Sequence, residues 1–389
     1  MITIIWISLF VVFYTYLGYG ILLYLLVRIR RLVKGKRAIA TNWDTLPTMT
    51  LVVAAYNEAD LMEAKIANTL ALEYPEDKLS VLFITDGSTD YSPEIISRYS
   101  SIKLMHSPER RGKINAIHRA MLEVDTEVVV FTDANTFLNK AALVRMARHY
   151  SDASTGAVSG EKRVKVEDVS DATAGEGFYW KYESTLKKWD SELYSVVGAA
   201  GELFSIRTSL YTPVPPDTVL DDFMLSLQIA ARGYRIVYEP EAYATENSSE
   251  NIKEELKRKI RIAAGGIQSI LRLKPLLNPF KYPLLSFQYI SHRVLRWTIT
   301  PFLMILAFVL NIVIVYQGNQ AVYDWLLLAQ SSFYLLAIAG FITQRMKMKI
   351  KIFFIPYYFC VMNYAVLMGI FRYFFKTQSA VWEKAQRKK

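Results

Sequence analysis

Four long apolar runs at the two ends of the chain constrain its fold more than any other feature. The first extends from Ile4 to Val27 without a charged residue, and three more follow at 298–316, 321–343 and 352–371. As helices, each is long enough to cross the hydrocarbon core of a bilayer, about 30 Å thick. Residues 45–265 between them have the composition of a water-soluble domain. The sequence therefore predicts a globular domain between membrane helices.

Basic residues follow the first apolar run, whereas a cleaved signal peptide carries them in front of it. They are Arg28, Arg30, Arg31, Lys34, Lys36 and Arg37. This order is typical of a retained anchor. Because basic residues stay on the cytosolic side of a membrane, the pattern predicts an N-terminus outside and a central domain in the cytosol, in a multi-pass protein of the plasma membrane.

Two courses remain open for the last apolar run, 352–371. The loop between Gln317 and Asp324 has no Lys or Arg and suits the outside, and the basic residues from Arg345 to Lys351 then return the chain to the inside. A full crossing by 352–371 would place the basic segment 376–389 outside, against this rule. A re-entrant or interfacial course would keep that segment in the cytosol.

The formal net charge of +10 does not indicate a nucleic-acid partner, because much of it flanks the apolar runs, where basic residues meet anionic lipid headgroups. Cys360 is the single cysteine, which excludes an intrachain disulfide and a cysteine metal cluster. The four histidines are spread along the chain and argue against a histidine-rich zinc site.

The central segment alternates short apolar runs with helix-length segments. The runs are Met49–Ala55, Val81–Thr85, Ile102–Met105 and Val128–Thr132, and the helical segments are 59–72, 91–99, 113–124 and 139–149. This alternation predicts an α/β fold with a mainly parallel sheet covered by helices on both faces. Ligands of such sheets bind beyond the carboxyl ends of the strands.

Polar residues stand at three of these strand ends. Met49–Ala55 runs into Asn57 and Glu58, Val81–Thr85 into Asp86, and Val128–Thr132 into Asp133 and Asn135. One such end would be an ordinary turn or helix cap. Three converging ends predict a ligand site.

Carboxylates gathered at one sheet edge would repel each other and a phosphate ligand. Mg²⁺ or Mn²⁺ relieves both repulsions, because these cations prefer oxygen ligands and keep substrate phosphates in their shell. Asp133 and Asn135 lie two residues apart and could face the same ion. Lys113, which follows Gly112 at a predicted helix start, suits a phosphate or is simply a solvated lysine.

A second acidic pair, Asp221 and Asp222, precedes a helical stretch that ends at Gly233. Both carboxylates suit the first turn of a helix, where they interact favourably with the helix dipole. Alternatively, one of them acts as a general base, with a pKa set by burial and by the neighbouring charge. The pattern alone favours neither interpretation.

Taken in order, these motifs resemble those of the family 2 glycosyltransferases with the GT-A fold. The four motifs are Ala54-Ala55-Tyr56-Asn57-Glu58, Asp86-Gly87-Ser88-Thr89-Asp90, Asp133-Ala134-Asn135, and Asp221-Asp222 before Gly233-Tyr234-Arg235. The resemblance covers about 48–268 and extends to the membrane layout of cellulose, hyaluronan and poly-N-acetylglucosamine synthases. It implies an inverting transfer of a sugar from a nucleotide-sugar, with a UDP-linked donor expected.

The resemblance also implies roles for individual residues. Asn57, Glu58 and Asp86 would hold the nucleoside, and Asp133 would begin the metal-binding motif with Lys113 near the diphosphate. Asp222 matches the inverting base, and Asp221 stands where Glu is usual. The segment Gly198-Ala199-Ala200-Gly201 resembles the lining of the acceptor channel. Arg258, Arg261 and Gln268 lie where the processive synthases have a Gln-x-x-Arg-Trp element.

Two departures from the family pattern bear on function. Asn135 replaces the second carboxylate of the metal motif, which removes one negative charge. At the place of the Gln-x-x-Arg-Trp element the chain has basic residues but no tryptophan, although Trp382 could approach from a cytosolic tail. Transfer to a glycan or to a polyprenyl-linked acceptor therefore competes with processive synthesis and secretion, and a nucleotide-binding regulator with a degenerate site is a further alternative.

The sequence thus predicts five segments. They are an anchor at 1–27, a cytosolic GT-A domain at 28–268, interfacial helices at 269–297, about three transmembrane helices at 298–375, and a basic tail at 376–389. The segment 270–292 is rich in Leu, Pro, Phe and Tyr, which is typical of helices at a membrane surface. A plain connector to the membrane helices would explain it equally well.

Overall fold

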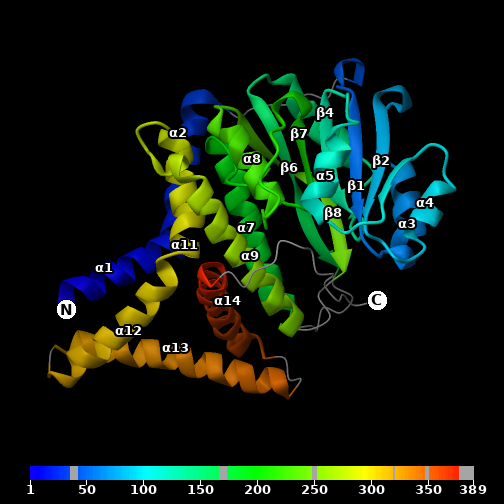
Figure 1. Ribbon diagram of the computed structural model, residues 1–389. Helices are drawn as coiled ribbons and strands as arrows, with labels where there is room; N and C mark the ends of the chain where they lie inside the picture. Colours follow the sequence, from blue (N-terminus) through cyan, green and yellow to red (C-terminus); the bar gives the residue numbers. More distant parts are fainter. Residues whose placement is uncertain (36–42, 166–172, 248–251, 319, 347–349, 376–389) are drawn as a thin grey trace.

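The computed structural model describes residues 1–35, 43–165, 173–247, 252–318, 320–346 and 350–375. The predictions made for Lys36, Arg37 and the tail 376–389, including Trp382, lie outside these residues. The described chain forms a sheet domain and a group of apolar helices beside it (Figure 1).

The sheet has eight strands in the order β3-β2-β1-β4-β7-β6-β8-β5. Its first half is parallel, as predicted, and consists of β1 (Met49–Ala55), β2 (Leu79–Asp86), β3 (Lys103–Ser107) and β4 (Val128–Asp133). The helices that follow these strands are α3 (Ala59–Leu70), α4 (Ser92–Ser97), α5 (Lys113–Met121) and α6 (Ala142–Ala147). β1 is buried on both faces, which is why it reads as an unbroken apolar run.

The second half of the sheet was not predicted and contains the antiparallel pairs. It consists of β5 (Phe137–Leu138), β6 (Thr155–Lys165), β7 (Leu203–Arg207) and β8 (Arg235–Asn247). β7 runs antiparallel to β4 and β6, and β5 pairs antiparallel with β8. The predicted α/β class is confirmed, but the sheet is mixed. Six of the thirteen residues of β8 are charged residues, Thr or Asn, so the strand lacks the apolar run that identifies a buried strand.

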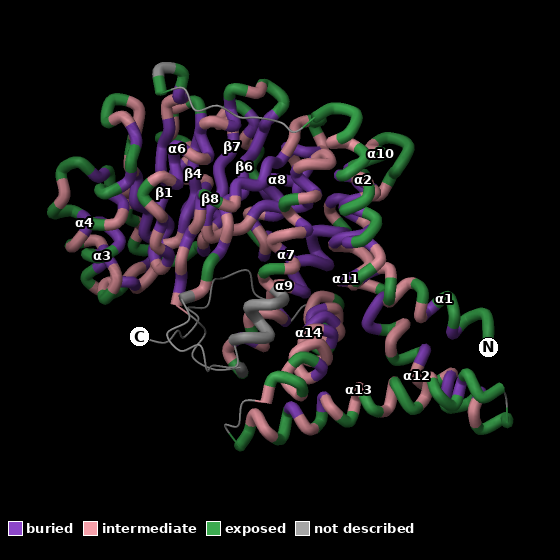
Figure 2. The backbone as a smooth tube through the Cα atoms, turned by 180° about the vertical axis from the view of Figure 1, so that it is seen from behind, coloured by how far each residue is buried: buried purple, intermediate pink, exposed green. Residues whose placement is uncertain are grey.

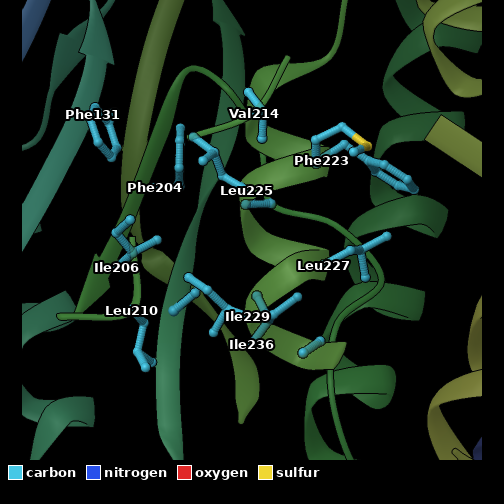
Figure 3. Close-up of a cluster of buried hydrophobic side chains, with 14 of the residues drawn as sticks. Phe131, Phe204, Ile206, Leu210, Val214, Phe223, Leu225, Leu227, Ile229 and Ile236 are labelled. Atoms are coloured by element: carbon cyan, nitrogen blue, oxygen red, sulfur yellow. The ribbon is translucent and has the colours of Figure 1, made fainter. Parts of the chain in front are cut away.

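A core between this half of the sheet and helix α8 (Asp221–Ala231) fixes the position of the second acidic pair. Phe204 and Ile206 of β7 and Ile236 of β8 pack against Leu225, Leu227 and Ile229 of α8 (Figure 3), and all six are at most 2% exposed. Each buried side chain of this size contributes roughly 1.5–3 kcal/mol. The start of α8 is therefore held on a rigid support.

The apolar runs form helices in which many residues are exposed (Figure 2), and many of these residues are large and hydrophobic. The N-terminal helix is continuous over Ile2–Lys34 and comprises α1 (Ile2–Phe13), η1 (Tyr14–Gly18) and α2 (Tyr19–Lys34). It is long and apolar enough to span a membrane, as are α13 (Ala321–Arg345) and α14 (Lys351–Phe374). These exposed surfaces indicate association with a membrane.

The predicted run 298–316 forms α12 (Thr300–Tyr316), which follows α10 (Pro283–Tyr289), η7 (Ile290–Val294) and α11 (Leu295–Trp297). The segment Pro283–Trp297 and α12 meet at a bend of 58° and reach the length of a span only together. The described residues therefore contain three candidate spans, or four if this bent pair is one.

Two of these helices are attached to the sheet domain. α2 packs against α7 (Thr173–Leu193), where Leu23 and Val27 contact Leu186 and Tyr19 donates a hydrogen bond to Asp190. α14 packs against α9 (Ile252–Arg272) and α13. The helices at the two ends of the chain contact each other through the rings of Tyr16 in η1 and Phe359 in α14.

Candidate active site

The predicted strand ends do come together. In the parallel register Ala54 stands opposite Ile84 on one side and Asp133 on the other, so β1, β2 and β4 end at the same edge of the sheet. The side chains there divide into two groups. Some bind neighbouring loops, and others face a cavity.

Asn57 and Asp86 bind loops. Asn57, with a positive φ of 51°, accepts a hydrogen bond from the Thr89 backbone N–H at 2.8 Å through its Oδ1. Asp86 Oδ2 accepts from the backbone N–H groups of Arg111 and Gly112 at 2.9 and 2.6 Å. These bonds shape the loop that precedes Lys113 at the start of α5.

A small recess beside Asp86 contains a stacked pair. The guanidinium of Arg110 lies 3.8 Å from the centre of the Tyr56 ring, and both residues line the recess together with Asp86. A Cβ at Gly87, whose φ is +68°, would come within 2.4 Å of Arg110, so a side chain at this position would displace the arginine. A planar guanidinium stacked on an aromatic ring is a suitable surface for a planar heterocycle such as a nucleobase.

Lys113 connects the strand ends with the second acidic pair. Its Nζ lies 2.8 Å from Asp133 Oδ1 and 3.5 Å from Asp221 Oδ2. Burial lowers the pKa of Lys113, but the negative charges of the neighbouring aspartates have the larger effect. The pKa of the lysine is therefore raised. Lys113 is therefore a paired, mostly buried cation and not a solvated lysine.

Asp133 and Asn135 present oxygen atoms that suit a hard divalent cation. Burial raises the pKa of Asp133, and Lys113 opposes this shift. The Oδ1 atom of Asn135 is buried and has no hydrogen-bond partner among the described residues. A buried oxygen without a partner costs free energy that a cation would recover. The described part of the chain brings no three His, Cys, Asp or Glu residues together as a metal site, so substrate phosphates would complete the coordination.

The loop that carries this pair rests on a buried lysine that sequence reasoning missed. Lys65 of α3 is fully buried, and its Nζ donates a hydrogen bond to the Thr136 carbonyl at 2.6 Å. Burial lowers the pKa of Lys65 to about 7. A lysine within a helical segment gives no sequence signal of burial, because most lysines on helices are solvated.

Asp221 and Asp222 occupy the first turn of α8 and line the cavity. Burial and the Asp221 charge raise the pKa of Asp222 to about 7, against the opposing effect of Lys113. A carboxylate with a pKa near 7 is suited to act as a base at neutral pH. Of the two interpretations of this pair, the geometry therefore favours the general base.

The segment Gly198–Gly201 also lines the cavity and touches Asp222. Gly198 has a φ of +90°, and a Cβ there would lie 2.2 Å from the Phe223 ring. A Cβ at Gly201 would lie 3.1 Å from Asp222 Oδ2. The Ala199 backbone N–H donates to Ser226 Oγ at 3.0 Å, which ties the segment to α8. Small residues let this backbone approach the carboxylate.

Helix α9 supplies two arginines to the cavity, but Gln268 lies elsewhere. Arg258 and Arg261 line the cavity, and Arg258 forms two hydrogen bonds of 3.0 Å with Glu255. Gln268 donates to the Asp217 carbonyl at 2.8 Å and accepts from the Val219 N–H at 2.9 Å. It is absent from the cavity wall and fixes the loop before Asp221.

A single cavity of about 1300 Å³ continues from the strand ends to the membrane helices, and the predicted site residues that line it are Glu58, Lys113, Asp133, Asn135, Gly198 to Gly201, Asp221, Asp222, Arg258 and Arg261. Sequence reasoning missed much of its wall. The additional lining residues include Lys162, Trp180, Glu183, Lys187, Glu202, Arg293, Arg296 and Trp297. Trp297 packs on α9, where a Cβ at Gly266 would lie 2.4 Å from its ring. Helix α9 lacks the tryptophan of the Gln-x-x-Arg-Trp element, but Trp297 from another segment packs against this helix.

A solved structure shares this fold over nearly the whole chain. The mannosyltransferase from Pyrobaculum calidifontis, in complex with GDP-Man and Mn²⁺, matches with a TM-score of 0.70 and 23% sequence identity over 96% of this chain and 100% of that one. The fold is therefore that of the GT-A glycosyltransferases.

The sequence comparisons identify the domain more closely. Residues 50–212 match the model of the family described as "Glycosyl transferase family 2". The chain therefore carries a glycosyltransferase family 2 domain, and the predicted resemblance is confirmed.

Curated relatives agree with this assignment. Poly-beta-1,6-N-acetyl-D-glucosamine synthases from Staphylococcus aureus (strain MSSA476) and Staphylococcus epidermidis are 29% and 26% identical over 241 and 231 residues. The matches cover 59% and 58% of this chain, and the chain spans only 57% and 56% of the length of these relatives.

Proposed function

We propose that this protein transfers a sugar, with inversion, from a UDP-linked donor to a glycan or lipid-linked acceptor at the membrane surface. The observation that carries the proposal is the shared cavity, which contains Asp133, Asp221 and Asp222 and reaches the membrane helices. In one displacement an acceptor hydroxyl loses its proton to Asp222 and bonds to the anomeric carbon. The bond from that carbon to the nucleoside diphosphate breaks at the same time.

Asp222 is the proposed base because of its place and its pKa. It lines the cavity at the start of α8, and burial together with Asp221 brings its pKa to about 7. At neutral pH it is ionised in a large fraction of molecules yet basic enough to accept a proton. Gly201 keeps the space beside its carboxylate open for the acceptor.

The donor site is proposed at the strand ends. Tyr56 and Arg110 offer a stacking surface for the nucleobase of the donor, beside Asp86. Glu58 lines the cavity, and Asn57 shapes the adjoining loop. Lys113, Arg258 and Arg261 are the proposed partners of the diphosphate. Gly198, Ala199, Ala200 and Gly201 would border the acceptor.

Asp133 and Asn135 are the proposed ligands of a divalent cation, Mg²⁺ or Mn²⁺. Bound there, the cation would neutralise charge on the leaving diphosphate. The solved mannosyltransferase contains Mn²⁺ with its nucleotide-sugar, which supports this expectation. For the donor, the curated relatives are named for N-acetyl-D-glucosamine polymers, so UDP-N-acetylglucosamine is the first donor to test.

We place the protein in the plasma membrane as a multi-pass protein with its sheet domain in the cytosol, where nucleotide-sugars are made. The basic residues after the first span support this orientation. One of them, Arg31, also forms a two-point ion pair with Glu192 of α7 at 2.6 and 2.7 Å. The sheet domain is thus fastened next to the cytosolic end of that helix.

The test is a transfer assay with the full chain in membranes, Mn²⁺ and a panel of UDP-sugars and GDP-mannose. We expect one UDP-sugar to be consumed, and Asp222→Asn to lower turnover by about 10²-fold or more while donor binding persists. The exposed Asp77→Asn is the matched control and should behave as wild type. Equal turnover by the Asp222 variant would refute the base assignment. Consumption of no donor would refute the function, and donor binding without consumption would favour the nucleotide-binding regulator.

Processive synthesis is the second candidate, because the curated relatives are named as polymer synthases and the cavity continues to α1 and α14. Sizing the product from a single encounter separates the two modes. Long polymers would establish processive synthesis, whereas one added sugar would establish single transfer.

A further inference from the structure

The membrane-facing half of the cavity has its own cluster of charged residues, apart from the donor side. Arg293 and Arg296 line it from η7 and α11, and Lys187 lines it from α7. The transfer chemistry described above uses none of them. Charged groups at the level of membrane helices are costly and therefore call for a function.

One carboxylate orients both arginines. Arg293 Nη1 lies 2.8 Å from Glu183 Oε1, and Arg296 Nη1 lies 2.9 Å from Glu183 Oε2. Behind them, His292 Nδ1 lies 2.6 Å from Asp190 Oδ2, and His292 Nε2 lies 3.1 Å from Glu183 Oε1. The side chains of Glu183, Asp190 and His292 are at most 4% exposed. The two guanidinium groups are therefore held in a fixed position at the cavity wall.

Lys187 stands beside this pair of arginines. Burial lowers its pKa and Arg293 lowers it further, whereas the carboxylates of Glu183, Glu202 and Glu161 raise it. Two guanidinium groups share Glu183, and a third cation stands next to them. Arginine pairs are well suited to phosphate, because the planar guanidinium donates two parallel hydrogen bonds to it.

Apolar side chains continue the cavity from this cluster toward the membrane surface. Tyr16 of η1 and Phe359 of α14 pack edge to face with their ring centres 4.7 Å apart. Phe13, Leu17 and Ile355 line the same cavity and are each more than half exposed. The cavity is thus bordered by apolar residues that also form the outer surface of the helices, between the N-terminal helix and α14.

The cluster also adjoins the catalytic residues. Arg293 Nε donates a hydrogen bond of 3.4 Å to the Val197 carbonyl, directly before the segment Gly198–Gly201. Trp297 contacts the ring of Phe223, the residue after Asp222, with ring centres 5.4 Å apart. A ligand whose anionic group rests on Arg293 would therefore have its next atoms beside the proposed base.

We propose that this half of the cavity binds a lipid phosphate, with the phosphate on Arg293 and Arg296 and the hydrocarbon chain between η1 and α14. This inference rests on the proposed function and specifies its acceptor as a sugar joined through phosphate to a membrane lipid. The sugar hydroxyl reaches Asp222, and the lipid chain stays in the bilayer.

The experiment measures binding to the full chain in phosphatidylcholine nanodiscs. The probes are farnesyl phosphate, farnesol and inorganic phosphate, each displacing a fluorescent farnesyl phosphate. We expect farnesyl phosphate to bind at least tenfold more tightly than either of the others, because only it provides both the anion and the chain. Arg293→Gln should reduce its binding at least tenfold, and Arg293→Lys should restore part of it. Phe359→Ala should weaken the binding of farnesyl phosphate but not that of inorganic phosphate.

Arg345→Gln is the matched control, because Arg345 lies at the end of α13, stacks on Phe341 and does not line the cavity. UDP binding is measured in every variant to show that the sheet domain is folded. Equal binding of farnesyl phosphate and farnesol would overturn the inference, as would equal losses in the Arg293 and Arg345 variants. If inorganic phosphate binds as tightly as farnesyl phosphate, the site recognises free phosphate and the inference also fails.

The proposed function can fail separately. If UDP-sugar is consumed but farnesyl phosphate does not bind, the inference falls and the transferase stands. If farnesyl phosphate binds as expected but no nucleotide-sugar is bound or consumed, the lipid site stands and the transferase falls.

Discussion

Lys113 Nζ lies 2.8 Å from Asp133 Oδ1, so the proposed cation ligand is already paired with a buried lysine. The same ammonium lies 3.5 Å from Asp221. One side chain therefore joins the donor side of the cavity to the acidic pair of α8, and a change there acts on both.

Replacing Lys113 with Met should move the pH dependence of catalysis upward. Lys113 lowers the pKa values of both Asp133 and Asp222, so its removal lets burial raise both further. Asp222 must be ionised to act as a base, and the acidic limb of kcat should shift from near 7 to a higher pH. The measurement is a pH–rate profile, with Lys140→Met, an exposed lysine, as control. An unchanged limb would show that Asp222 is not the group that titrates.

Asp221→Asn should shift the same limb in the opposite direction. The Asp221 charge is the second cause, after burial, of the raised pKa of Asp222. Without that charge Asp222 ionises at a lower pH, so activity extends to more acidic solutions. The plateau value of kcat falls as well if Asp221 also positions the acceptor. Profiles of kcat for wild type and variant, recorded between pH 5 and pH 9, check this. A shift toward higher pH would contradict it.

Asn135→Asp should strengthen cation binding by about tenfold, because cation affinity rises with the number of charged ligands. The Oδ1 atom of Asn135 is already buried without a partner among the described residues, so the geometry need not change. A titration of UDP binding with Mn²⁺ gives the apparent affinity. Asn115→Asp, a change at a half-buried residue of α5 that does not line the cavity, serves as the control. Equal affinities in all three proteins would exclude residue 135 as a ligand.

Gly201→Ala should lower kcat by roughly ten- to a hundredfold with little effect on donor affinity, because small misplacements of a reacting group are costly. The new Cβ would lie 3.1 Å from Asp222 Oδ2, which must give way by a few tenths of an ångström. Steady-state kinetics with the donor varied separates kcat from KM. A variant with normal kcat would show that the acceptor does not pass between these residues.

Asp222→Asn should stabilise the protein at pH 8 and leave it unchanged at pH 4. The pKa of Asp222 is raised by folding, so the folded state holds its proton to higher pH than the unfolded chain, and stability falls as pH rises from about 4 to about 7. The neutral amide of the variant does not ionise, so the variant does not lose stability in this way. Thermal unfolding of the detergent-solubilised protein at both pH values tests the sign. A lower melting temperature at pH 8 would contradict it.

The parallel half of the fold was predictable because each of its strands is an apolar run. The strand ends carry Asn57, Asp86 and Asp133 in a recognisable order, and their convergence follows from the parallel register. β6 and β8 gave no such signal, because they carry charged residues that pair inside the protein. Lys162 of β6, for instance, is 6% exposed and bonds to Glu202 at 2.6 Å.

The site was predictable where the motif is local and not where distant segments meet. Asp133 and Asp222 could be identified from their neighbours in sequence. Glu183 and Arg293 are 110 positions apart, and nothing in either segment indicates that they form an ion pair. The role proposed for Gln268 depended on sequence position alone, and its side chain instead supports the loop at Asp217 and Val219.

The N-terminal helix forms part of the wall of the cavity through Val12, Phe13, Tyr16 and Leu17, and Tyr19 is bonded to Asp190 of the sheet domain. Trimming this helix to obtain a soluble catalytic fragment would therefore remove a side of the reaction chamber and expose Leu186, which it covers. Purification strategies for this protein have to retain residues 1–34 and supply a lipid or detergent for them.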